Sequence, residues 1–275
     1  MKKSKKLKYW GWGYEETTLN KEEIKSLLNK LYKYGIVSSD KRSTPPIESI
    51  NLNKPKIEIP PNLKSISTEE KYQRILHSFG QSQPDSIRTF QSDFNHAPDL
   101  VSYPENENDL ITLYDFCEKS NVALIPYGAG SSVVGGVTSD VSSKYNGTIS
   151  VNLSKFNKVL EVDDVSLSAK IQGGIRGPDL ERSLKNYGLT LRHFPQSFEH
   201  STLGGWIATR SGGHFATLYT HIDDLVENIS MISPNGKMNS LRVPGSGAGP
   251  SPDRFMLGSE GSMGIITDAW VKLQK

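Results

Sequence analysis

The fold is decided by Val122-Ala-Leu-Ile-Pro-Tyr-Gly-Ala-Gly-Ser-Ser-Val-Val-Gly-Gly136, an apolar run that leads directly into a glycine-rich loop. The run predicts a strand over 122–127. The small residues after it let backbone N–H groups approach a phosphate, and Ser131 and Ser132 add hydroxyl donors. The pattern is neither the dinucleotide fingerprint, whose third glycine would fall at Val133, nor a Walker loop. A phosphate-binding loop and a plain surface turn are the two interpretations.

The rest of the chain mixes helices with strands. Asn20 to Tyr34 has the apolar spacing of an amphipathic helix, with Asn20 as N-cap and Gly35 as the stop. Five prolines between 38 and 66 predict an extended connector and not a packed element. Further helices are expected over 67–77, 105–120 and 177–187, and strands over 148–153, 166–171, 225–233 and 264–273, with a hairpin turn at Asn235-Gly236. This order predicts an α+β fold and not a regular βαβ array.

Composition excludes several classes of protein. The 275 residues carry a net charge of +2 with 35% hydrophobic residues, which argues against a disordered chain and against a nucleic-acid partner. No apolar run reaches the ~18 residues of a transmembrane helix. The single cysteine, Cys117, excludes an internal disulfide framework and a cysteine-cluster zinc site, so we expect no metal. Cys117 is expected to pack in the core, and the protein to be cytoplasmic.

Charge divides the chain into two parts. Residues 1–92 contain 17 Lys and Arg against 10 Asp and Glu, whereas residues 93–275 contain 15 against 20. We therefore expect a basic N-terminal extension over 1–92 and a glycine-rich body over 93–275. The basic residues at the start of the chain either form a solvated tail or make a weak peripheral contact with anionic lipid. The cluster of Tyr9, Trp10, Trp12 and Tyr14 has a glycine spacing that fits an arm packed on the body better than base stacking.

Three further polar loops support a ligand site. They are Gln196-Ser-Phe-Glu-His-Ser-Thr-Leu-Gly-Gly-Trp206, Thr209-Arg-Ser-Gly-Gly213 and Gly258-Ser-Glu-Gly-Ser-Met-Gly-Ile-Ile-Thr267. A large, flat cofactor with a diphosphate needs several such loops from distant parts of the chain. Trp206 itself, between glycines and an apolar run, is expected in the core.

With these loops in view, residues 97–275 resemble the PCMH-type FAD-binding domain of the vanillyl-alcohol oxidase superfamily of FAD-linked oxidases, which has two α+β subdomains. Tyr9-Trp-Gly-Trp-Gly-Tyr14, Leu191-Arg-His-Phe-Pro-Gln-Ser-Phe-Glu-His-Ser-Thr-Leu-Gly-Gly-Trp206 and the following Ala-Thr-Arg210 are most similar to the alkyldihydroxyacetonephosphate synthases. The chain departs from that family at Gln196, His200 and Ser211-Gly212, where Asp, Phe and Ala-Ser are usual. These differences bear on the identity of the substrate, and FAD binding is still expected.

The resemblance implies non-covalent FAD and a set of cofactor-binding residues. In some relatives a histidine of an Arg-Ser-Gly-Gly-His string holds FAD covalently, but there the string is the pyrophosphate loop, so His214 is not expected to do so. Glu199 and Glu260 are expected to bond ribose or loop backbone, because diphosphate repels carboxylates. The expected FAD contacts are Pro126, Tyr127, Gly128, Ala129, Gly130, Ser131, Ser132, Gln196, Ser197, Phe198, Glu199, His200, Ser201, Thr202, Thr209, Arg210, Ser211, Gly212, Glu260, Gly261, Ser262, Met263, Gly264, Ile265 and Ile266.

The activity implied by the resemblance belongs to ether-lipid synthesis. It exchanges the acyl chain of acyl-dihydroxyacetone phosphate for a fatty alcohol, through an adduct at flavin N5. Two alternatives stay open, namely an FAD-dependent oxidoreductase of a hydroxy acid or alcohol, and a non-catalytic FAD-binding subunit. Weak catalytic candidates are His200 and Arg210.

The synthases continue into a substrate or cap domain, which is absent from these 275 residues. The chain is therefore expected to be a fragment, half of a split enzyme or a degenerate member. A lipid-like phosphate substrate is expected only with that C-terminal half, and a homodimer is a further expectation.

Overall fold

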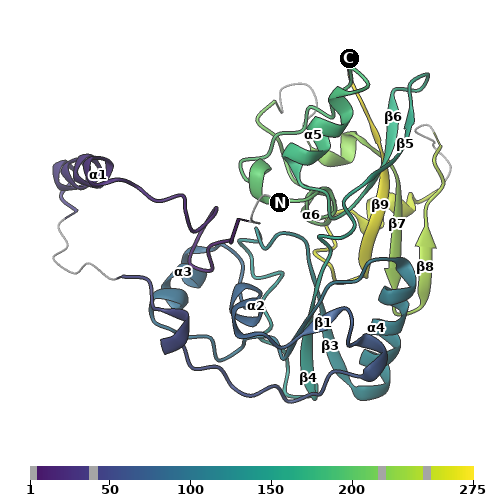
Figure 1. Cartoon of the computed structure of the whole chain (residues 1–275). Coiled ribbons are helices and arrows are strands. Elements are labelled where there is room, and N and C mark those ends of the chain that lie inside the picture. The colour runs from purple at the N-terminus through teal and green to yellow at the C-terminus, as the bar shows by residue number, and fades with distance from the viewer. Residues whose placement is uncertain (1–4, 37–42, 216–220, 244–248) are drawn as a thin grey trace.

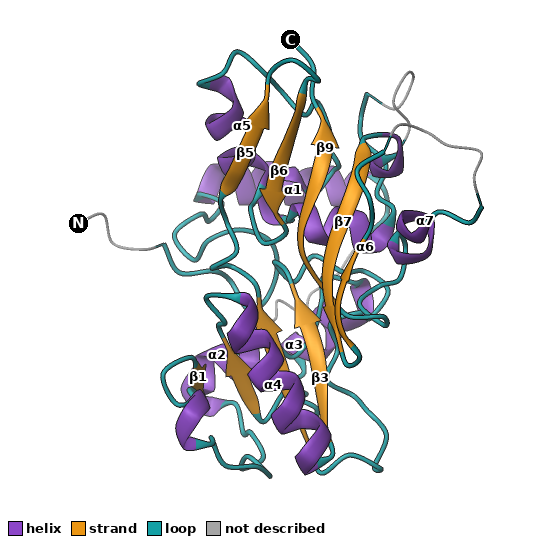
Figure 2. Cartoon of the chain, turned by 90° about the vertical axis from the view of Figure 1, so that its right-hand side faces the viewer, coloured by secondary structure: helices purple, strands orange, loops and turns teal. Residues whose placement is uncertain are grey.

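The computed structural model describes residues 5–36, 43–215, 221–243 and 249–275. Figure 1 shows two sheets with helices around them, and an N-terminal helix that stands away from both. Figure 2 shows the five-stranded sheet above the four-stranded one, with the two arranged end to end. The chain thus has the expected α+β fold of two subdomains.

The four-stranded sheet has the order β1-β2-β4-β3. Its strands are β1 (Ser67–Thr68), β2 (Leu100–Ser102), β3 (Val122–Tyr127) and β4 (Gly147–Asn152). β4 runs parallel to both neighbours and is buried at every position, as is typical of central parallel strands. Helix α4 (Glu107–Ser120) covers this sheet and buries Leu110, Leu113 and Cys117 against it. Cys117 is therefore a packing residue, as predicted.

The five-stranded sheet is antiparallel, with the order β5-β6-β9-β7-β8. Its strands are β5 (Val159–Asp163), β6 (Ser168–Gln172), β7 (Val226–Ser233), β8 (Gly236–Asn239) and β9 (Ile265–Lys272). The predicted hairpin joins β7 to β8, and Gly236 adopts φ +105° there. Helices α5 (Gly177–Lys185), α6 (Leu203–Thr209) and α7 (Pro252–Met256) share its apolar cluster.

Helix α1 (Lys21–Lys33) begins at its predicted cap. The Asn20 side chain accepts hydrogen bonds from the amides of Glu22 and Glu23, and the Glu23 carboxylate accepts one from the Asn20 amide. No residue of α1 is buried in this chain. Before it, the aromatic arm packs on the body, because Tyr9 is buried and the Tyr72 hydroxyl donates to the Leu7 carbonyl at 2.7 Å.

Two predictions for the N-terminal part are wrong. The proline-rich segment is packed within its described residues 43–66, since it contains η1 (Ile47–Ser49) and η2 (Pro61–Leu63) and buries Ile50 and Leu63 completely; its residues 38–42 lie outside the described part. The helix expected over 67–77 begins later, as α2 (Lys71–Leu76), because Ser67 and Thr68 pair with β2 instead. Helix α3 (Gln83–Phe90) was not predicted.

No helix within the described ranges is long and apolar enough to cross a membrane. The expected contact of the basic start with lipid falls partly on residues 1–4, which are outside those ranges.

His77 is a completely buried histidine just after α2. Its Nδ1 donates to the Gln73 carbonyl at 2.7 Å, so its Nε2 accepts from the Asn152 side-chain amide at 2.8 Å. Both ring nitrogens are thus satisfied in the neutral form. Burial lowers the pKa of His77 to about 4, and burial likewise lowers the pKa of His193 to about 4.

These two histidines predict a loss of stability in mild acid. The unfolded chain takes up a proton on each histidine near pH 6.5, whereas the folded chain does so only near pH 4. The free energy of unfolding should therefore fall as the pH drops from 6.5 to 4, by up to about 1.4 kcal/mol per pH unit for each histidine. Urea unfolding at pH 7, 6 and 5 measures this slope. His77→Gln should make it shallower and the exposed control His214→Gln should not; equal slopes in all three proteins would contradict the assignment.

Candidate functional site

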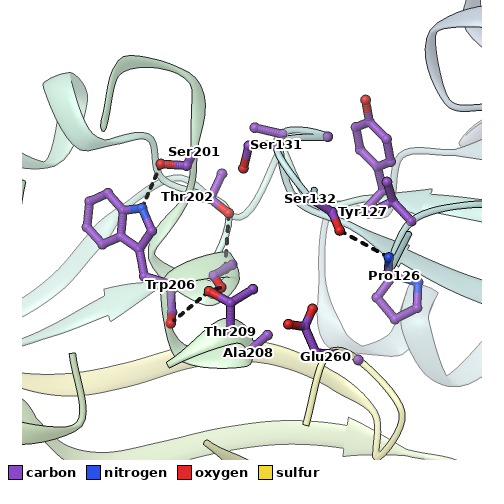
Figure 3. Close-up of a pocket in the computed structure, with 18 of the residues that line it drawn as sticks. Pro126, Tyr127, Ser131, Ser132, Ser201, Thr202, Trp206, Ala208, Thr209 and Glu260 are labelled. Atoms are coloured by element: carbon purple, nitrogen blue, oxygen red, sulfur yellow. Dashed lines mark hydrogen bonds between the residues drawn. The ribbon is translucent and has the colours of Figure 1, made fainter. Parts of the chain in front are cut away.

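A cavity of about 360 Å³ lies where the two sheets meet. One wall comes from the end of β3 and the loop after it, a second from residues 197–202 and helix α6, and a third from residues 260–266 before and in β9. Figure 3 shows Ser131, Thr202, Thr209 and Glu260 from these walls facing one another. All four of the loops singled out in the sequence therefore contribute residues to one space.

The first wall is the glycine loop, residues 127–136. Gly130 adopts φ +75°, and a Cβ there would lie 2.0 Å from the Tyr127 hydroxyl oxygen. A Cβ at Gly128 would lie 2.5 Å from the Thr202 hydroxyl oxygen of the second wall. The Ser132 hydroxyl accepts a hydrogen bond from the Gly136 amide at 3.0 Å. The loop therefore approaches its neighbours through its backbone, and no side chain can be added at either glycine without movement.

The second wall is built around α6. Thr202 caps the helix by accepting from the Gly205 amide at 3.3 Å. Trp206 is only 2% exposed and its indole Nε1 donates to the Ser201 hydroxyl at 2.7 Å (Figure 3). Its predicted place in the core is confirmed, although one edge also lines the cavity. The Thr209 hydroxyl donates to the Gly205 carbonyl at 3.0 Å.

Close main-chain contacts occur around the cavity, two of them on the side of the five-stranded sheet and one between the two sheets. The Gly204 amide donates to the Gly173 carbonyl at 2.7 Å, and the Gly173 amide donates to the Thr267 carbonyl at 2.8 Å. A Cβ on Gly174 would lie only 1.8 Å from the carbonyl oxygen of Leu153, the residue that follows β4. The floor of the cavity is therefore made by main chains in direct contact.

Among the described residues, the cavity lining contains one carboxylate, that of Glu260. The same described lining contains no Lys, Arg or His. The backbone of Glu260 is left-handed, with φ +51°, and its amide donates to the Ala208 carbonyl at 2.9 Å. The carboxylate points into the cavity (Figure 3), and no hydrogen bond to it occurs within the described part of the chain. Although the side chain is exposed at the opening, partial burial raises the pKa of Glu260.

The cavity brings together many of the predicted residues. Those that line it are Pro126, Tyr127, Gly128, Ala129, Gly130, Ser131, Ser132, Ser197, Ser201, Thr202, Thr209, Ser211, Glu260, Gly261, Gly264 and Ile266. Predicted residues outside the lining are Gln196, Phe198, Glu199, His200, Arg210, Gly212, Ser262, Met263 and Ile265. In η3 (Phe198–His200), Phe198 stacks on Trp206 from behind with 6.2 Å between ring centroids.

The two weak catalytic candidates lie outside the cavity. His200 contacts the aromatic arm, with its ring centroid 6.0 Å from that of Trp12, and burial lowers the pKa of His200. Arg210 pairs with Asp223 of η4 (Ile222–Asp224) at 2.7 Å, and Arg254 joins the same carboxylate at 2.9 Å. The guanidinium of Arg210 is thus held by a surface ion pair and does not contact the cavity.

Sequence reasoning missed several lining residues. Val133, Val134 and Gly136 belong to the quoted loop, and Gly204 and Gly205 form the glycine pair before Trp206, so their motifs already pointed to them. The remaining missed residues are Val137, Leu153, Gly173, Trp206 and Ala208. Leu153 and Gly173 gave no signal, because they enter the lining only through the contact between the two sheets.

Comparison with known proteins identifies the family. A sequence profile described as an FAD binding domain matches residues 98–242, which is more than half of the chain. Alkyldihydroxyacetonephosphate synthase of Dictyostelium discoideum is 40% identical over 205 residues, which are 74% of this chain and 33% of that protein. The synthase of Caenorhabditis elegans is 29% identical over 295 residues, covering 98% of this chain and 49% of that protein.

A solved structure of alkyldihydroxyacetonephosphate synthase superposes with a TM-score of 0.84 at 32% identity, covering 98% of this chain and 54% of that one. The chain therefore spans about a third to a half of the curated relatives it matches. Its two-sheet architecture is that of the PCMH-type FAD-binding fold expected from the sequence. The chain belongs to the FAD binding domain family, and its cofactor is FAD.

Proposed function

We propose that this chain is the FAD-binding part of an alkyldihydroxyacetonephosphate synthase-like enzyme, which exchanges an acyl for an alkyl chain on acyl-dihydroxyacetone phosphate. The observation that carries the proposal is the similarity to a solved synthase over 98% of the chain, far beyond the profile match at 98–242. The shared part includes most of the N-terminal 92 residues. The division into an extension over 1–92 and an FAD-binding domain over 93–275 is part of the proposal, supported by the start of the profile match at residue 98.

FAD is proposed to bind in the cavity between the sheets, with its diphosphate against the glycine loop. The residues present fit this group. A volume of about 360 Å³ is within the usual range for small-molecule sites, and a Cβ at Gly128 or Gly130 would meet a neighbour at 2.5 Å or less. Because the described lining residues include no Lys, Arg or His, backbone N–H groups and the hydroxyls of Ser131, Ser132 and Thr202 are the proposed donors for a diphosphate.

The carboxylate of Glu260 is proposed to accept hydrogen bonds from hydroxyl groups of the cofactor. It points into the cavity and has no hydrogen-bond partner within the described chain, so donors on a bound ligand would replace the water that hydrates this exposed carboxylate. A diphosphate offers none, whereas ribityl and ribose hydroxyls do. FAD supplies the difficult chemistry when bound, and the residues of this chain hold, orient and shield it.

The expected partners and cellular location are also part of this proposal. A lipid-like phosphate substrate would be bound only in the presence of a C-terminal half like that of the synthases, which has no counterpart in these 275 residues. A homodimer is compatible with helix α1, which buries no residue in this chain. A cytoplasmic protein that contacts a membrane only peripherally is supported by the basic start. His200 and Arg210 would act on substrate only from outside the cavity.

The first prediction from this proposed function concerns how FAD is held. We expect non-covalent binding, because the described part of the cavity lining contains no histidine or cysteine and His214 lies outside it. Purified yellow protein should release its flavin into the supernatant on acid precipitation, measured by absorbance at the flavin band. Flavin that stays in the washed pellet would contradict non-covalent binding.

The second prediction concerns the glycine loop. Gly130→Val places a branched side chain at φ +75° and against the Tyr127 hydroxyl. The FAD affinity of the folded variant should fall at least tenfold, which is about 1.4 kcal/mol or more. The matched control is Gly188→Val, because Gly188 has φ +68° but open space around it and lies outside the lining. Titration showing equal affinities for both variants would remove the glycine loop from the site.

The third prediction separates the proposed activity from its alternatives. FAD-loaded residues 1–275 should form no alkyl product from acyl-dihydroxyacetone phosphate and hexadecanol, because groups that orient the substrate contribute roughly 7–11 kcal/mol to such reactions and lie in the unshared half of the synthases. Alkyl product formed by residues 1–275 alone, measured by radiolabelled hexadecanol incorporation, would contradict this expectation. Dye reduction with a 2-hydroxy acid and no alkyl product would favour an oxidoreductase instead.

A further inference from the structure

The glycine loop is attached to a segment that precedes the profile match. The Gln81 amide donates to the Ser132 carbonyl at 2.7 Å, and the Tyr127 hydroxyl donates to the Leu76 carbonyl at 3.2 Å. The two bonds join the beginning and the end of the phosphate-facing turn to residues 76–81. The profile for the FAD binding domain begins only at residue 98, so this supporting segment, residues 76–81, is additional to the family's shared core.

The contact between the two segments is between main chains. Gly80 is buried, and a Cβ there would lie 2.0 Å from the Ser132 carbonyl oxygen and 2.9 Å from its carbonyl carbon. Neither atom belongs to a flexible side chain that could move aside. The glycine at position 80 therefore lets the supporting segment reach the loop closely enough for the Gln81 amide to bond it.

The supporting segment is itself held rigidly. The His77 ring lies 4.2 Å from the Tyr127 ring between centroids, and its Nε2 is bonded to Asn152, the residue that pairs with Tyr127 across β3 and β4. From the other side, the buried Arg74 donates to the carbonyls of Pro98 at 2.7 Å and Asn53 at 2.9 Å. The segment is thus fastened to both strands that flank the loop and to the chain around it.

We propose that residues 76–81 are a positioning element that holds the glycine loop in its ligand-binding conformation before FAD arrives. This inference rests on the proposed role of the loop in binding the diphosphate. A loop that is ordered in advance loses less conformational entropy on binding, and that gain appears as affinity. Gly80 acts through the loop and not by touching the ligand, since it is outside the cavity lining.

The test compares Gly80→Ala with Gly147→Ala. Gly147 begins β4, away from the cavity lining, and a Cβ there would also be crowded, at 2.8 Å from Ile57 and 2.9 Å from the Asp99 carboxylate. Amide hydrogen exchange of residues 128–136 is measured without FAD, and FAD affinity is measured by fluorescence titration. We expect Gly80→Ala to speed exchange in the loop and to weaken FAD binding at least tenfold. Gly147→Ala should leave both within twofold, even if it lowers the unfolding midpoint equally.

Two results would overturn the proposal. One is unchanged exchange and affinity in Gly80→Ala; the other is an equal loss of affinity in Gly147→Ala. If Gly80→Ala does not fold, Tyr127→Phe decides, because it removes only the hydroxyl bonded to Leu76. Because Tyr127 itself lines the cavity, the deciding readout for this variant is exchange without FAD, which should be faster over 128–136; wild-type exchange would refute the positioning role.

The same data separate this proposal from the one it rests on. FAD should slow exchange at residues 128–132 of the wild-type protein. If it does not, the loop is not the diphosphate site, and the proposed function fails together with the positioning role. If it does, while Gly80→Ala binds FAD normally, only the positioning role fails.

Discussion

The structure depends on the direct contact of main chains at the junction between the two sheets. β3 pairs with β4 up to Tyr127 and Asn152, and the next residue of each strand then turns toward the cavity. Leu153 N–H donates to the Tyr127 carbonyl at 3.0 Å, and the Leu153 carbonyl oxygen lies against Gly174. Because these contacts leave no room for side chains, a shift of either sheet would move two walls of the cavity together.

This constraint explains why the sequence was informative about local elements and less so about their assembly. The strand at 122–127 and helix α1 follow from short patterns, an apolar run before glycines and an Asn20 cap, and both formed at the predicted positions. Strand β5 was missed because its Leu160 and Glu161 are exposed and give no clear alternation. Its place is fixed by pairing with β6, which is a contact between separate segments.

The residues of the cavity could likewise be predicted from short sequence motifs, but not where contacts between distant segments decide their position. The loops of the cavity could be predicted, since each carries glycines and hydroxyls in a short stretch. Phe198 and His200 lie in one of those stretches but face Trp206 and the aromatic arm instead, because η3 turns their side chains away from the cavity. The burial of Ile50 and Leu63 could not be read from a segment dominated by prolines, because it depends on distant residues. Leu63 packs in the cluster that contains α4, and Ile50 packs in the cluster that contains Tyr9 and Phe94.

Charge adds a last constraint on how the cavity can hold a diphosphate. The lining supplies one carboxylate and no cation among the described residues, and Arg210 lies outside the lining, paired with an Asp223 carboxylate that Arg254 shares. Attraction for a dianion must then come from backbone dipoles, whose effect depends steeply on direction and distance, and not from point charges that act over many ångströms. A site of this kind tolerates little movement of its loop. The tight contacts of Gly80 and Gly174 with neighbouring main chains, and of Gly130 with the Tyr127 ring, are therefore not incidental to packing, because they fix the geometry on which the binding of an anion would rest.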